Sequence, residues 1–126
     1  MTQLTILTGK DTDLEISKVT RLINNEANKF KTVWVAKSAQ EAVEKAKALN
    51  PHLVVLPTTM PGFSGFTATT MIKKAAPTAC VILICDELND NCRAMAYAVG
   101  ADHIIARADM PTELYRLLET LIKVNE

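Results

Sequence analysis

Short apolar runs alternate with longer segments of helical period along almost the whole chain. Five runs rich in Val, Ile or Leu have the length of buried strands: Leu4–Thr8, Thr32–Ala36, Leu53–Leu56, Cys80–Cys85 and His103–Ala106. The central runs V-V-L and V-I-L-I are continuously apolar, which is typical of strands covered on both faces. Because a helical segment follows each strand, the pattern predicts a parallel sheet between two layers of helices.

Two predicted helices occupy the first half of the chain. The first follows Asp11 and carries apolar residues at three- and four-residue spacing, namely Ile16, Val19, Ile23, Ala27 and Phe30. The second begins at Ser38 with the S-x-x-E pattern of a capping box, in which Ser38 and Glu41 each accept from the other's backbone N–H. It is predicted to end near Leu49, because Pro51 prevents its continuation.

Three more helices are predicted in the second half, over Phe66–Ala75, over Asp90–Val99 and from about Pro111 onward. The first of them contains several threonines, which are poor helix formers, so it needs support from tertiary packing. Gly100 is a natural C-terminal cap for the second. The last shows a single apolar face made of Leu114, Leu117, Leu118, Leu121 and Ile122.

Composition restricts the possible functions. The 126 residues are expected to form one domain, 1–126, with no separate output domain. Lys and Arg together equal Asp and Glu, so the net charge is zero and nucleic acid is not an expected partner. No apolar run is long enough to span a membrane and no signal peptide is evident, so a cytoplasmic protein is expected.

The cysteines and histidines suggest no metal or cofactor. Cys80, Cys85 and Cys92 lack C-x-x-C spacing, and reduced thiols are the expected state. Cys85 is interpreted as a small apolar strand residue rather than a redox sensor. His52 precedes the third strand and His103 opens the fifth, and surface roles are expected for both.

Several motifs together resemble the receiver domain of bacterial response regulators. They are P-H-L-V-V-L followed by M-P-G-F-S-G, then V-I-L-I, then A-V-G-A-D, and the resemblance covers about Leu4 to Val124. It implies a flavodoxin-like fold, a doubly wound (βα)5 three-layer sandwich with strand order 2-1-3-4-5. In such α/β folds the functional residues stand at the carboxyl ends of the strands.

The family's chemistry is phosphoryl transfer from a histidine kinase to an aspartate that ends the third strand. Two acidic residues help that aspartate hold Mg²⁺, and a Ser or Thr and a Lys contact the phosphoryl group. The family also has an aromatic residue that moves with the Ser or Thr. By the resemblance, this chain replaces each of these residues: Thr8 and Gly9 stand at the acidic pair, Pro57 at the acceptor aspartate, Cys85 at the Ser or Thr, Ile104 at the aromatic and Arg107 at the Lys. Ala108 stands where a proline usually follows the lysine.

These substitutions favour a degenerate receiver that is not an enzyme and acts by docking to protein partners or to itself. In the family, the fourth helix, fifth strand and fifth helix commonly form the contact face, which here offers Arg93, Tyr97, His103, Tyr115 and Arg116. The alternative hypothesis is a switch that responds to a small ligand, an anion or redox state at a remodelled pocket containing Lys10, Cys85 and Arg107.

The acidic residues near these positions are not expected to rebuild the family's Mg²⁺ site. Asp11, Asp13 and Asp86 are displaced along the chain from the family's positions and are interpreted as helix-start and loop residues. Arg107 is expected to pair with Asp86 or Asp11, or to reach solvent, because a buried unpaired guanidinium would be strongly unfavourable.

Overall fold

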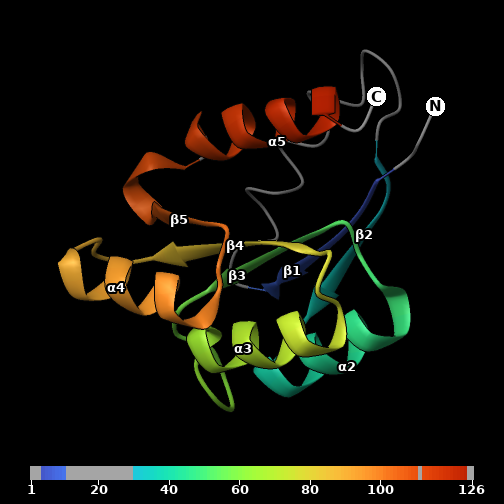
Figure 1. Cartoon of the computed structure of the whole chain (residues 1–126), viewed down its shortest axis with the longest axis horizontal. Helices are drawn as coiled ribbons and strands as arrows, with labels where there is room; N and C mark the ends of the chain where they lie inside the picture. Colours follow the sequence, from blue (N-terminus) through green and yellow to red (C-terminus); the bar gives the residue numbers. More distant parts are fainter. Residues whose placement is uncertain (1–3, 11–29, 111, 125–126) are drawn as a thin grey trace.

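A computed structural model of the chain describes residues 4–10, 30–110 and 112–124, and within these ranges five parallel strands form one sheet. Their order is β2-β1-β3-β4-β5, which confirms the predicted topology (Figure 1). The bounds are β1 Leu4–Gly9, β2 Phe30–Ala36, β3 Leu53–Pro57, β4 Cys80–Cys85 and β5 His103–Ala106. The non-consecutive order places the crossover between β1 and β3, beside which functional residues of such folds lie.

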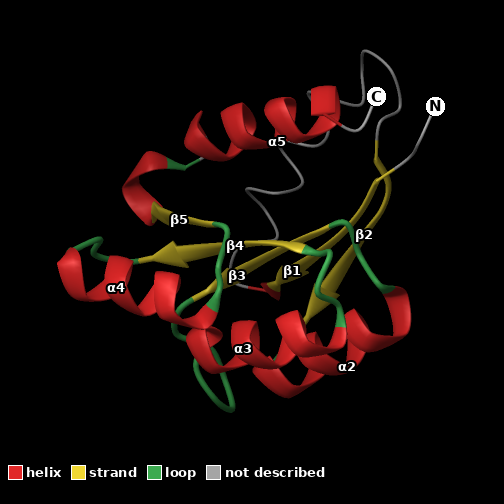
Figure 2. Cartoon of the chain, in the orientation of Figure 1, coloured by secondary structure: helices red, strands yellow, loops and turns green. Residues whose placement is uncertain are grey.

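Helices cover both faces of the sheet. Figures 1 and 2 show α2, α3 and α4 together on one side and α5 on the other. The bounds are α2 Ala39–Leu49, α3 Gly65–Ala75, α4 Asp90–Val99, the short 3₁₀ helix η2 Arg107–Asp109 and α5 Thr112–Val124. The three-layer sandwich and the positions of these four α-helices are therefore confirmed.

The first predicted helix lies outside the described residues, apart from its last apolar position. Phe30 was assigned to that helix, but it is the first residue of β2 and pairs with Leu4 of β1. The assignment was wrong because a single apolar residue at the junction of two elements satisfies both the helical and the strand period.

Both ends of α2 have defined caps. The Ser38 side chain accepts a hydrogen bond from the Glu41 backbone N–H at 3.2 Å, as predicted. The reciprocal half of the capping box differs, because the Glu41 carboxylate accepts from the backbone N–H of Lys37 at 3.3 Å rather than from Ser38. At the other end Asn50 adopts a left-handed conformation with φ of 47°, directly before Pro51.

Two threonines of α3 find hydrogen-bond partners within the helix itself. Thr69 is buried, and its hydroxyl donates to the Gly65 carbonyl at 2.8 Å. The hydroxyl of Thr70 donates to the Phe66 carbonyl in the same way at 3.5 Å. The polar groups of these poor helix formers are thus satisfied within the helix, while packing of α3 against the sheet supplies the stability.

Alternate residues of the strands enter two separate cores, one on each face of the sheet. On the side of α2, α3 and α4 the fully buried residues of β3 are Val54 and Leu56. On the side of α5 they are Leu53 and Val55, which pack with Leu114 and Leu118 among others. Burial on both faces explains why the central strands are continuously apolar.

The A-V-G-A-D motif joins α4, β4 and β5. Gly100 ends α4 in a left-handed conformation with φ of 85°, which favours glycine. Two residues later, the Asp102 carboxylate accepts from the Val81 backbone N–H at 2.8 Å and pairs with the Lys73 ammonium at 2.7 Å. This part of the resemblance therefore reflects structural requirements rather than chemistry.

Candidate functional site

The predicted site positions gather at the carboxyl ends of the strands. The strand register pairs Thr8 with Val55, Pro57 with Ile84 and Cys85 with Ala106, so these ends lie along one edge of the sheet. Arg107 follows directly after β5 at the same edge. The sequence-based expectation that these positions are near one another agrees with the topology.

Pro57 is the last residue of β3 and is buried. The next residue, Thr58, continues the ladder by donating its N–H to the Ile84 carbonyl at 2.9 Å. Proline is therefore accommodated at a strand end, where the missing N–H interrupts little of the sheet. Its side chain is a saturated ring with no nucleophilic atom.

The backbones of two glycines enclose Pro57. A Cβ atom on Gly9 would lie 2.8 Å from Cδ of Pro57, and a Cβ on Gly65 would overlap the Pro57 carbonyl oxygen. Gly65 also donates its N–H to the Thr58 carbonyl at 2.9 Å, which fixes the start of α3 against the end of β3. Pro57 and the two glycines thus form one close-packed unit, in which the ring lies against Gly9 and the carbonyl group against Gly65.

The polar groups beside this unit interact with each other. The hydroxyl of buried Thr8 donates to the Gly9 carbonyl at 3.4 Å. At the other side of the edge, Nε of Arg107 contacts Oδ1 of Asp86 at 2.8 Å. This ion pair confirms the expectation for Arg107, and its partner is the exposed Asp86.

Cys85 lies beside a second thiol that sequence reasoning did not associate with it. The sulfur atoms of Cys85 and Cys92 are 2.8 Å apart, and the Glu87 carbonyl lies 3.1 Å from the Cys85 sulfur. Burial, together with the hydrogen bond between the two thiols, raises the pKa of the Cys85 thiol. The available sequence signal was a cysteine at a strand end and another in the first turn of the next helix.

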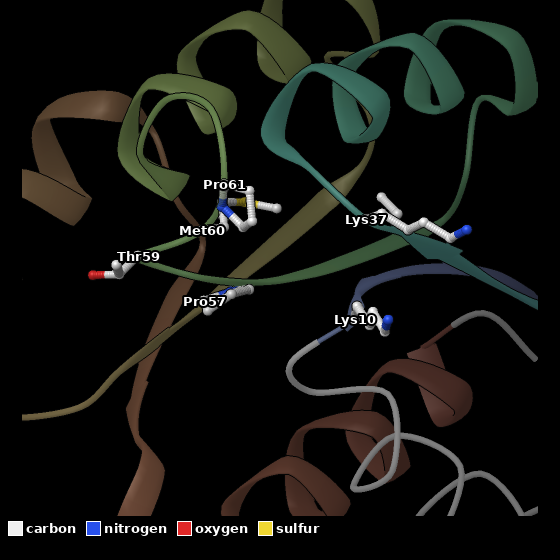
Figure 3. Close-up of a pocket in the computed structure, with 7 residues that line it drawn as sticks. Lys10, Lys37, Pro57, Thr59, Met60 and Pro61 are labelled. Atoms are coloured by element: carbon white, nitrogen blue, oxygen red, sulfur yellow. The ribbon is translucent and has the colours of Figure 1, made fainter.

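A cavity of about 610 Å³ opens beside Pro57 (Figure 3). Its described lining consists of Lys10, Ala36, Lys37, Pro57, Thr59, Met60 and Pro61. Two lysines beside a mainly apolar wall suit a small anion with an apolar part. The alternative hypothesis placed Lys10 in a pocket with Cys85 and Arg107, but those two residues do not line this cavity, and Lys37, which sequence reasoning missed, does.

The predicted contact residues differ in their exposure. Arg93, Tyr97, His103 and Arg116 are exposed, with Tyr97 at 87%. Tyr115 is half-buried and packs against the core on the α5 side. Ile104, at the position of the family's moving aromatic, is also half-buried and packs against the opposite core.

Two further expectations concern metals and membranes. Within residues 4–10, 30–110 and 112–124, no group of three His, Cys, Asp or Glu side chains is arranged to hold a metal ion. Asp11 and Asp13 lie outside these residues. In the same ranges no helix has both the length and the apolar character that crossing a membrane requires.

The strand order and the helices on both faces of the sheet are those of a flavodoxin-like α/β domain. Residues 6–119 match the Response regulator receiver domain family, and the chain therefore belongs to that family. Among solved structures, the signal receiver domain of the putative response regulator NarL from Mycobacterium tuberculosis superposes with a TM-score of 0.80 at 21% identity, covering 98% of each chain. A CheY-like receiver domain protein from Methanospirillum hungatei gives a TM-score of 0.79 at 17% identity, covering 97% of this chain and 95% of that one.

The similar sequences include proteins of different lengths. Chemotaxis protein CheY of Thermotoga maritima is 34% identical over 98 residues, which are 77% of this chain and 78% of CheY. Transcriptional regulatory protein YvrH of Bacillus subtilis is 29% identical over 123 residues, 98% of this chain but 51% of YvrH. A protein-glutamate methylesterase/protein-glutamine glutaminase of Vibrio parahaemolyticus is 32% identical over 96 residues, 76% of this chain and 26% of that protein. The chain thus spans about half or less of the length of the last two.

Proposed function

We propose that this domain is a pseudo-receiver, a module of bacterial signal transduction that docks to protein partners without being phosphorylated and without catalysing a reaction. The observation that carries the proposal is the buried Pro57 at the end of β3, enclosed by the backbones of Gly9 and Gly65. In the receiver family this strand end carries the aspartate that accepts the phosphoryl group.

The chemistry of phosphoryl transfer supports this proposal. An acceptor must supply a nucleophilic oxygen, and Mg²⁺ needs oxygen ligands to neutralise the charge of the incoming phosphoryl group. The ring of Pro57 and the backbone of Gly9 offer no carboxylate, and Thr8 directs its hydroxyl to the Gly9 carbonyl. The carboxylate of Asp86, at the same edge, interacts with Arg107.

The exposed side chains near β5 support docking at that end of the sheet. β5 is the last strand of the sheet, paired on one side with β4, and it follows α4 and precedes α5 along the chain. Tyr97 on α4 is almost fully exposed, although tyrosine has a large apolar ring. Tyrosine and arginine are enriched at interaction hot spots, so Tyr97 with Arg93 and Arg116 forms our proposed contact face.

The first prediction is that a small phosphodonor does not modify the protein. After incubation with acetyl phosphate and Mg²⁺, we expect the intact mass to stay unchanged, because Pro57 provides no acceptor oxygen. A receiver domain that retains the acceptor aspartate, treated in parallel, serves as the positive control. A stoichiometric gain of about 80 Da, the mass of one phosphoryl group, on an aspartate would contradict the proposal.

The second prediction is that Tyr97→Ala reduces partner capture at least tenfold without affecting the fold. A hot-spot truncation weakens binding by about 2 kcal/mol or more, while an exposed side chain contributes little to stability. The measurement is quantitative capture from a lysate of the native host, with and without a phosphodonor, together with a test for concentration-dependent self-association.

Met71→Ala is the matched control for this experiment. Met71 is also a large exposed apolar residue, at 41%, but it lies on α3, outside the proposed face. Tyr115→Ala is a poorer probe, because Tyr115 packs against the core. If Tyr97→Ala and Met71→Ala retain partners equally well, the choice of face is wrong.

A further inference from the structure

Two thiols meet where β4 ends and α4 begins. Cys85 is the last residue of β4 and is buried, and Cys92 stands half-buried in the first turn of α4. Their sulfur atoms are 2.8 Å apart. We propose that Cys85 and Cys92 form a reversible intramolecular disulfide, a modification site that is independent of the docking function proposed above.

The two sulfur atoms are close to bonding distance. The bonded distance between two sulfur atoms is about 2.05 Å, so the observed 2.8 Å contact needs to shorten by only about 0.8 Å. No element has to unfold to bring the thiols together, because the folded backbone already does so. The bond would close the six-residue loop 86–91.

Secondary structure holds both cysteines in place. Cys85 pairs with Ala106 of β5 in the sheet register. The N-cap residue Asn89 accepts a hydrogen bond from the Cys92 backbone N–H at 2.9 Å, which fixes the first turn of α4. The Glu87 carbonyl lies near both sulfurs, at 3.1 Å from Cys85 and 3.6 Å from Cys92. The contact is therefore built from a strand end, a capped helix and the loop between them.

The oxidant we invoke is a low-molecular-weight disulfide. The more accessible Cys92 loses its proton and attacks one sulfur of the oxidant, forming a mixed disulfide and releasing one small thiol. The Cys85 sulfur then loses its proton and attacks the Cys92 sulfur, releasing the second small thiol. The protein gives up two electrons and two protons, the oxidant becomes two thiols, and an excess of reduced thiol reverses the reaction.

The environment of Cys85 agrees with this order of events. Burial raises the pKa of its thiol, which keeps it protonated and makes it a poor first nucleophile. Its sulfur nevertheless lies 2.8 Å from the Cys92 sulfur, so it is placed to attack a mixed disulfide formed on Cys92. Cys92 is thus the residue that meets the oxidant, and Cys85 is the one that resolves it.

Cys80 provides an internal control. It begins β4, about 16 Å from Cys85 along a strand that rises about 3.3 Å per residue, so it cannot reach either thiol. Burial and the nearby Asp102 carboxylate raise the pKa of Cys80 to about 11, which keeps it unreactive at neutral pH. We expect Cys80 to remain a free thiol throughout.

The test treats the full chain with oxidised glutathione, quenches it with acid and labels the remaining thiols with a maleimide under denaturing conditions. We expect the loss of two of the three thiols, a mass decrease of about 2 Da before labelling from the two lost hydrogens, a cross-linked peptide containing Cys85 and Cys92, and reversal by dithiothreitol. Cys80→Ser should still form the bond and leave no free thiol.

Cys92→Ser and Cys85→Ala should each abolish the internal bond. Cys92 is half-buried, so Cys92→Ser tests the proposal even if Cys85→Ala fails to fold, and circular dichroism reports whether each variant is folded. Three labelled thiols in the treated protein would overturn the proposal. So would a persistent glutathione adduct on Cys92, or a cross-link that includes Cys80.

Discussion

Gly65→Ala is expected to destabilise the domain by about 3 kcal/mol or more, the largest effect of a single methyl group that we predict. The added Cβ would overlap the carbonyl oxygen of Pro57 and would also lie 3.0 Å from Cα of Thr58. Both obstacles are backbone atoms, which cannot rotate away as a flexible side chain can. Relief requires α3 to move away from the end of β3, which would break the 2.9 Å hydrogen bond from Gly65 N–H to the Thr58 carbonyl.

Urea unfolding of the wild type and of Gly65→Ala measures this loss. Gly62→Ala is the matched control, because it adds the same methyl group three residues earlier in the same M-P-G-F-S-G stretch. Gly62 has a φ of 96°, so alanine there is strained by about 1–2 kcal/mol, but its Cβ would meet only ordinary contacts with Ala39. If both variants lose the same free energy of unfolding, close packing of Gly65 on Pro57 is not the reason for the glycine.

The fold was predictable because its strands are buried on both faces. The run Leu53–Pro57 is buried throughout, so its sequence shows no alternation that could be confused with an exposed strand. Helix ends were predictable where a single residue determines the backbone, as at Ser38 and Gly100. Phe30 was assigned wrongly because, at an element boundary, apolar character alone fits both a helix and a strand.

The site was less predictable than the fold, because its contacts join segments that are distant in the sequence. The order of the elements predicted that Pro57 and Gly9 share an edge, but not that the proline ring touches the glycine. Likewise, the seven-residue spacing of Cys85 and Cys92 matches no common motif, and only the turn from β4 into α4 brings the sulfurs together. Lys37 lies beside the cavity because Ala36, the last residue of β2, pairs with Gly9 at the end of β1.

Gly9→Ala is expected to destabilise the wild-type protein by about 1–3 kcal/mol, because the new Cβ would lie 2.8 Å from Cδ of Pro57. The proline ring is rigid, and Gly65 packs against the carbonyl group of Pro57, so the residue has little room to shift. In a Pro57→Ala background Cδ is absent, and the same Gly9→Ala change should cost less than about 0.5 kcal/mol. Urea unfolding of the wild type, both single variants and the double variant forms the complete cycle.

The coupling energy between these two changes tests whether Gly9, at an acidic position of the family, is glycine because Pro57 stands at the acceptor position. A coupling energy of about 1 kcal/mol or more in favour of the double variant would show that Pro57 restricts residue 9 to glycine. An aspartate side chain, which is larger than a methyl group, would then be excluded from position 9 for as long as the proline is present. If the loss of unfolding free energy in the double variant equals the sum of the two single losses within about 0.5 kcal/mol, the two positions are independent and this explanation is wrong. With the coupling present, restoring a carboxylate at position 9 requires replacing Pro57 first, so the loss of the acceptor also blocks the return of one metal ligand.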